Sequence, residues 1–210
     1  MIGLGQYRGG LPAMPFADRD SRLFSRYLTD ALGYADENVA TLIDGEATKG
    51  DLEKHFERWL PNRVREGDEV FVYFAGHGAG EKGKAYLLPY DGDPDYLEGT
   101  GYSLERLYKS LGALPGPATI VLDAGFAAAR LPAPPSNVAI LFAASPEQRR
   151  GDDGRGHGLF TYFLLKEIKR GVEAGALDLK AAFDKAAPLV SDAARRQGAN
   201  QEPRWQGPRR

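Results

Sequence analysis

The chain has 210 residues, of which 42% are hydrophobic and 27% charged, a balance that fits one globular domain and excludes disordered and fibrous classes. The formal net charge of -2 gives no electrostatic reason to expect nucleic acid as a partner, and no apolar run is long enough to predict a membrane span. The chain contains no cysteine, which excludes disulfides, thiolate metal sites and thiol catalysis.

The first part of the chain alternates strand and helix patterns, as in a parallel sheet with crossover helices. The predicted elements are a strand at 1–5, a helix at 17–33, a strand at 38–43, a helix after Thr48 and a strand at 68–76. Thr48 and Asp51 have the spacing of a capping box. Because Met1 falls inside the first predicted strand, we expect a single domain at 1–210 that is part of a longer protein.

The second part continues the same alternation. The predicted elements are a hairpin arm at 84–93, a helix capped by Ser103, strands at 118–124 and 137–145, and helices at 158–171 and 178–196. The basic segment 195–210 is expected to be largely a solvated tail, in which 201–205 could form a last edge strand. The fold class is therefore α/β with a mostly parallel sheet.

A glycine-rich loop, "FAGHGAG" at 74–80, follows one of the two most apolar strands. Sites in doubly wound sheets lie at the carboxyl ends of strands, so His77 is a candidate general base, although it could equally be an inert turn residue. The same loop satisfies the spacing Gly-x-Gly-x-x-Gly at 78–83. A dinucleotide site needs a helix to begin there, and the segment 84–93 is not helical, so we reject that interpretation.

Three other features could bind a metal or take part in chemistry. Asp91, Asp93 and Asp95 resemble the start of a Ca²⁺ loop, but Tyr96 stands where such a loop needs glycine, so a solvated turn is favoured and no cofactor is expected. His55 is expected at the surface of its helix. His157 precedes an apolar helix and is given only a minor chance of a direct role.

Four motifs occur in one order along the chain: "YFAGHGAG", "VLDAGFAAA", "GHGLFTYFLL" and "QEP". Together with the first helix, "AMPFADRDSRLFSRYL", they resemble a bacterial caspase-like domain of the caspase, metacaspase and orthocaspase group. The resemblance covers nearly the whole chain. It implies a caspase–hemoglobinase fold, a three-layer α/β/α sandwich with about six strands in a mostly parallel sheet. The activity it implies is that of a cysteine endopeptidase.

The chain departs from this family at the nucleophile. The family motif Asp-x-Cys-x-Ser-Gly reads "DAGFAA" here, so Gly125 stands at the cysteine position and Ala127 and Ala128 stand at those of serine and glycine. The resemblance makes His77 the family base, and it assigns the backbone N–H groups of Gly78 and Gly125 to an oxyanion hole.

The same resemblance assigns two acids, Asp20 and Asp123, to a pocket for an Arg or Lys side chain. The plainer interpretations are a solvated helix acid for Asp20 and a strand-end acid bonded to local backbone for Asp123.

Three functions remain open on the sequence. The first is a proteolytically inactive pseudoprotease that binds peptide or protein segments containing Arg or Lys. The second is an inactivated form of an Arg/Lys-specific caspase-like cysteine endopeptidase, and the third is a generic ligand-binding α/β domain. Because the chain has no signal peptide and no predicted span, a cytoplasmic location is expected, whereas the oligomeric state cannot be predicted from the sequence.

Overall fold

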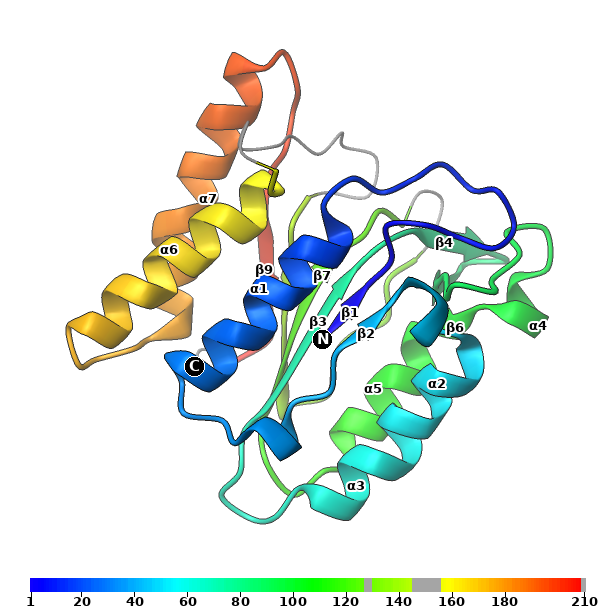
Figure 1. The fold of residues 1–210 in the computed structure, drawn as a ribbon, viewed down its shortest axis with the longest axis horizontal. Helices are drawn as coiled ribbons and strands as arrows, with labels where there is room; N and C mark the ends of the chain where they lie inside the picture. Colours follow the sequence, from blue (N-terminus) through cyan, green and yellow to red (C-terminus); the bar gives the residue numbers. More distant parts are fainter. Residues whose placement is uncertain (127–129, 145–155, 209–210) are drawn as a thin grey trace.

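The computed structural model describes residues 1–126, 130–144 and 156–208. Over these residues the central sheet has six strands in the order β2-β1-β3-β7-β8-β9 (Figure 1). The strands are β1 (Ile2–Gly3), β2 (Leu42–Ile43), β3 (Val70–Ala75), β7 (Ala118–Asp123), β8 (Val138–Phe142) and β9 (Arg204–Gln206). All neighbours are parallel except β8 and β9. The predicted mostly parallel sheet is confirmed.

Helices cover both faces of this sheet, as a three-layer sandwich requires (Figure 1). One face carries α1 (Ala17–Asp30), α6 (Leu159–Glu173) and α7 (Leu179–Arg196). The other carries α5 (Leu104–Gly112) and a continuous helix formed by α2 (Lys49–Lys54), the π-helical turn η3 (His55–Trp59) and α3 (Leu60–Arg63). Each face has its own cluster of buried apolar side chains. Among the described residues, no helix is long and apolar enough to cross a membrane.

Local signals in the sequence explain where these helices begin. The Thr48 hydroxyl accepts from Asp51 N while the Asp51 carboxylate accepts from Thr48 N, so the predicted capping box is present. Ser103 caps α5 through Arg106 N, and Asp178 caps α7 through Ala181 N. Helix α1 ends at Asp30, earlier than predicted, and the chain turns there through Gly33, whose φ is +75°.

The register of the sheet brings the ends of β3 and β7 together. These two strands pair along six residues, from Val70 opposite Ala118 to Ala75 opposite Asp123. The loop after β3 and the turn after β7 therefore leave the sheet at the same edge, as the sequence predicted for neighbouring strands.

The glycine-rich loop forms a hairpin rather than a helix. Strands β4 (Gly78–Glu81) and β5 (Lys84–Leu87) are antiparallel, and β6 (Tyr102–Ser103) completes a small three-stranded sheet beside the short helix α4 (Leu97–Thr100). Lys82 and Gly83 have φ values of +50° and +77°, as a two-residue hairpin turn demands. The prediction that the segment after these glycines is not helical is confirmed, since it forms the β4–β5 hairpin.

The two edge strands of the sheet bear out their predictions to different degrees. The strand expected at 38–43 is reduced to β2, because Asp36–Asn38 form a 3₁₀ turn (η1) and the neighbouring β1 supplies only two residues for pairing. The last edge strand expected within 201–205 is present as β9, shifted towards 204–206, where it pairs with β8. The rest of the tail is less solvated than expected, since Gln201, 1% exposed, donates from Nε2 to Ala143 O at 2.9 Å.

Candidate functional site

The residues that the sequence singled out meet at the carboxyl edge of the sheet. His77 and Gly78 follow β3, Asp123 is the last residue of β7 with Gly125 just beyond it, and Asp20 lies in the first turns of α1. Gly76 N donates to Asp123 O at 3.2 Å, which joins the two loops directly at the sheet edge. Parallel α/β sheets form their sites at this edge, because the loops after neighbouring strands converge there.

The orientation of the His77 ring is fixed by the loop that follows β1. Its Nε2 lies 2.7 Å from Pro12 O, and because a carbonyl oxygen can only accept, this nitrogen carries a proton. Nδ1 is then the basic nitrogen. On the other side Tyr7 packs against the ring at 5.0 Å between centroids, and its hydroxyl accepts from His77 N at 2.6 Å. These contacts therefore fix the orientation of the ring.

Gly78 and Gly125 are in direct backbone contact. A Cβ atom on Gly78 would lie 2.4 Å from Gly125 O and 2.6 Å from the Phe126 ring, so only glycine allows this approach. Phe126 is 1% exposed and anchors the turn in the core. Ala127 and Ala128, which stand at further motif positions, lie outside the described residues. The loop that carries His77 thus lies against the turn that contains Gly125.

The two predicted acids, which we call the acidic pair, converge on the start of α6. Asp20 is 2% exposed and Asp123 is 7% exposed. A Cβ atom on Gly158, the N-cap residue of α6, would lie 3.1 Å from Asp20 Oδ2 and 3.4 Å from Asp123 Oδ2. The interpretation of Asp20 as a solvated helix acid is therefore wrong, because Asp20 lies on the buried face of α1 with Phe24 and Leu28.

His157 is a member of this cluster to which the sequence gave only a minor role. Its Nδ1 lies 2.7 Å from Asp20 Oδ1, while Gly158 N donates to Asp20 Oδ2 at 3.0 Å. Burial raises the pKa of Asp20 to about 7, the hydrogen bonds from Gly158 and His157 oppose that rise, and the charge of Asp123 adds to it. The sequence held one signal for this cluster, the apolar helix that begins just after His157. A helix N-terminus attracts carboxylates, so an acid such as Asp20 could be expected near His157.

The three acids that resembled a Ca²⁺ loop have other contacts. Asp91 Oδ1 accepts from Lys49 N at 2.8 Å at the start of α2, and Asp93 Oδ1 accepts from Asp95 N at 2.9 Å within its own turn. Across the described part of the chain, no group of three or more His, Cys, Asp or Glu side chains could hold a metal ion. His55 is half-buried, and its Nδ1 lies 2.8 Å from Asp51 O within its own helix.

Comparisons with known proteins agree with this architecture. The family model of the caspase domain matches residues 1–209. No match was found among curated proteins. In fold the chain is similar to the crystal structure of protein GSU0716 from Geobacter sulfurreducens, with a TM-score of 0.72 and 17% identity over 99% of this chain and 92% of that one. The chain therefore belongs to the caspase domain family, and it belongs to it without a cysteine.

Proposed function

We propose that this domain is a pseudoprotease that binds Arg- or Lys-containing peptide segments without cleaving them. The observation that carries the proposal is the buried acidic pair beside a nucleophile position that holds only Gly125. The covalent step of a cysteine peptidase requires a thiolate, and this chain has none.

The chemistry of the acidic pair favours a cation. Two buried carboxylates that both approach Gly158 repel one another when ionised, and the charge of Asp123 contributes to the raised pKa of Asp20. A guanidinium or ammonium group placed between them would relieve that repulsion, and guanidinium could also bond to both acids through its fork of N–H donors. The pair therefore suits the side chain of Arg or Lys in a bound segment.

The test compares two peptides that differ only in charge. An Arg-containing peptide and its citrulline analogue, which is a neutral isostere, are titrated by calorimetry at pH 8, where Asp20 is ionised. We expect the Arg peptide to bind at least about tenfold more tightly, the factor that corresponds to roughly 1.4 kcal/mol. We also expect no cleavage of either peptide.

Variants of the protein separate this role from a structural one. Asp20→Asn and Asp123→Asn retain the shape of each side chain and should abolish the preference for Arg over citrulline. Asp18→Asn removes an acid from the same turn of α1, away from the His157 contact, and should preserve the preference. Equal affinity for both peptides in the unmodified protein, or their hydrolysis, would refute the proposal.

A second function is favoured by the geometry around His77. The bond from Nε2 to Pro12 O orients the His77 ring, and the contact between Gly78 and Gly125 brings its loop against the Gly125 turn. This arrangement supports an Arg/Lys-specific endopeptidase that has been inactivated at residue 125. Restoring the thiol at residue 125 distinguishes the two cases and is treated among the predictions below.

A further inference from the structure

A groove of about 260 Å³ lies between α1 and α6, which run side by side over one face of the sheet (Figure 1). We call it the helix groove. It is lined by Leu23, Arg26, Tyr27, Asp30 and Ala31 on the α1 side and by Lys169 of α6. Asp20 lies on the buried face of α1, whereas Arg26 lies on its exposed face. The groove is therefore separate from the acidic pair and independent of the function proposed above.

The size and the apolar residues of the helix groove suit a single side chain. Pockets that enclose a whole small-molecule ligand usually measure about 300–1,000 Å³, and this groove is smaller. Leu23 and Tyr27 are half-buried and pack on the apolar cluster of their face of the sheet, so part of each remains exposed in the groove. Apolar side chains of a protein partner bind in such depressions as anchors.

Three arginines form a row along the exposed face of α1. Arg19, Arg22 and Arg26 are exposed, and their spacing of three and four residues places them on one side of the helix over about 10 Å. Among the described residues, none of their guanidinium groups forms an ion pair. The whole chain has a formal net charge of -2, so this row is a local excess of positive charge, and its N–H donors suit carboxylates.

Two lysines of α6 form the opposite side of the groove. Lys169 lines it directly, and Lys166 lies three residues earlier on the same side of the helix. Lys166 Nζ lies 5.9 Å from the centroid of the Tyr162 ring, and Lys169 Nζ lies 3.7 Å from Glu173 Oε1. Exposed ion pairs of this kind contribute little stability, so Lys169 can exchange Glu173 for a carboxylate of a ligand.

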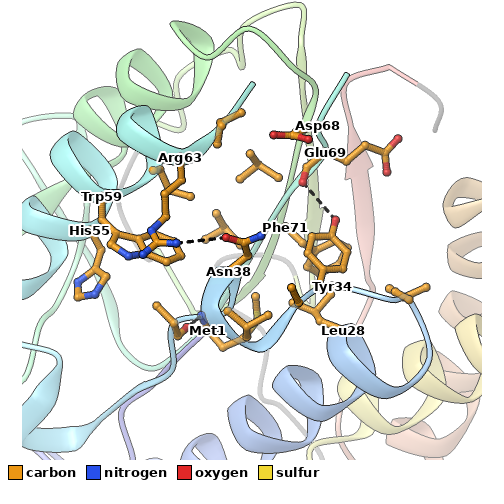
Figure 2. Close-up of a pocket in the computed structure, with 18 of the residues that line it drawn as sticks. Met1, Leu28, Tyr34, Asn38, His55, Trp59, Arg63, Asp68, Glu69 and Phe71 are labelled. Atoms are coloured by element: carbon orange, nitrogen blue, oxygen red, sulfur yellow. Dashed lines mark hydrogen bonds between the residues drawn. The ribbon is translucent and has the colours of Figure 1, made fainter. Parts of the chain in front are cut away.

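The polar groups of a larger cavity, at the amino end of β3, are by contrast bonded to one another (Figure 2). There Arg63 donates to Asn38 Oδ1 at 3.3 Å, and the Tyr34 hydroxyl donates to Glu69 O at 3.2 Å. The Arg26 guanidinium of the helix groove has no such partner among the described residues. Of these two cavities, the helix groove is therefore the one whose guanidinium is available to a ligand.

The arrangement of charge and apolar surface favours a helix of an acidic partner protein. Basic rows lie on either side of the apolar residues, so a complementary ligand has an apolar stripe with acids on both flanks. Within each row the basic residues are about one helical turn apart, the interval at which acids follow one another on the flank of a helix. Asp30 also lines the groove, and its carboxylate would repel the closely spaced phosphates of a nucleic acid.

From these features we propose that the helix groove binds an amphipathic helix of a partner protein, whose apolar stripe is flanked on both sides by acidic residues. One apolar side chain of that helix lies against Leu23 and Tyr27. The carboxylates of one flank pair with the arginine row of α1, and those of the other flank pair with the two lysines of α6. In this mode of recognition the apolar residues anchor the ligand and the charged flanks select it. Two turns of the ligand, about 11 Å, cover the arginine row.

The test uses the peptide Ala-Glu-Leu-Glu-Ala-Leu-Leu-Ala-Glu-Leu-Glu-Ala-Leu-Leu, labelled with fluorescein at its amino end and amidated. As a helix it presents a leucine stripe with glutamates on both flanks. We expect saturable binding by fluorescence anisotropy, weakened by added salt because exposed charges are screened. The counterpart with glutamine at every glutamate position keeps the leucine stripe without the charge. It should bind at least about tenfold more weakly.

Two double variants of matched chemistry locate the binding. Arg26→Glu with Lys169→Glu reverses the charge on both sides of the helix groove, so it should lose the glutamate peptide and bind the counterpart that carries lysine instead. That gain also shows that the variant is folded. Lys54→Glu with Arg58→Glu makes the same changes at exposed residues on the opposite face of the sheet and should retain binding of the glutamate peptide.

Equal affinity for the glutamate and glutamine peptides, or equal loss of binding in the two double variants, would overturn the proposal. A fluorescein-labelled single-stranded oligonucleotide serves as the competing ligand. If it binds more tightly than the glutamate peptide and is lost in the Arg26→Glu, Lys169→Glu variant, the proposal is also overturned and the groove is assigned to nucleic acid.

Discussion

Asp20→Asn is predicted to stabilise the protein at pH 8 and to leave its stability nearly unchanged at pH 4. Asp20 is 2% exposed, and its pKa is raised from 3.8 to about 7, chiefly by burial. The native state therefore binds a proton at this carboxyl more tightly than the unfolded state does. As pH rises from 4 to 7, the Asp20 carboxyl ionises more easily in the unfolded state than in the native state. The free energy of unfolding therefore falls over this range.

The size of this loss follows from the two pKa values. At about 1.4 kcal/mol for each pH unit between 3.8 and 7, ionised Asp20 costs the native state about 4 kcal/mol above pH 7. Asparagine carries no charge, yet its amide can still accept from Gly158 N and donate to His157 Nδ1, so both contacts of the carboxylate are conserved. We expect the variant to gain about 2–4 kcal/mol at pH 8 relative to pH 4.

The assay is urea-induced unfolding followed by tryptophan fluorescence at pH 4, 6 and 8. Groups that titrate alike in both proteins cancel in the difference between their unfolding free energies, which leaves the acidic pair and His157. Asp18→Asn serves as the control, and its difference from the unmodified protein should be the same at all three pH values. A difference for Asp20→Asn that does not grow with pH, or a variant less stable than the parent at pH 8, would refute the reasoning.

Two further predictions concern the contact between the base loop and the nucleophile turn. Gly78→Ala should destabilise the fold by about 1–3 kcal/mol in chemical denaturation, because its Cβ would meet Gly125 O. Gly50→Ala should not, because its Cβ would come no closer to another residue than 3.9 Å, from Thr48 Oγ1. Gly125→Cys should cleave reporter peptides after Arg or Lys, and the double variant with His77→Ala should lose that cleavage, because His77 is then missing as the base. A Gly125→Cys protein that binds the Arg peptide but never cleaves it would show that more than the thiol has been lost.

Much of the fold could be predicted because its signals are local. The apolar runs of β3 and β7 identified two strands buried on both faces, and Thr48 with Asp51 marked the start of a helix by their spacing alone. The convergence of the His77 loop and the Gly125 turn followed from one further step, since adjacent parallel strands end at one edge.

The features that were missed depend on contacts between distant parts of the chain. Helical periodicity could have placed Asp20 with Phe24 on the buried face of α1, but nothing local pairs it with His157, which lies 137 residues away. The shortening of the strand predicted at 38–43 has a similar cause. Residues 39–41 favour an extended backbone, yet a strand needs a neighbour, and only Ile2 and Gly3 of β1 provide one.

The proposed binding role and the predicted instability have the same physical origin. Burying Asp20 beside Asp123 makes its ionised form costly in the empty protein, and a cationic ligand would remove that cost by supplying the opposite charge. Asp20→Asn should therefore both stabilise the empty protein and abolish recognition of Arg. If Asp20 were purely structural, its replacement would change the stability of the protein without changing the preference for the Arg peptide over the citrulline peptide. Retaining a carboxylate that destabilises the empty protein is what the proposed binding role would require.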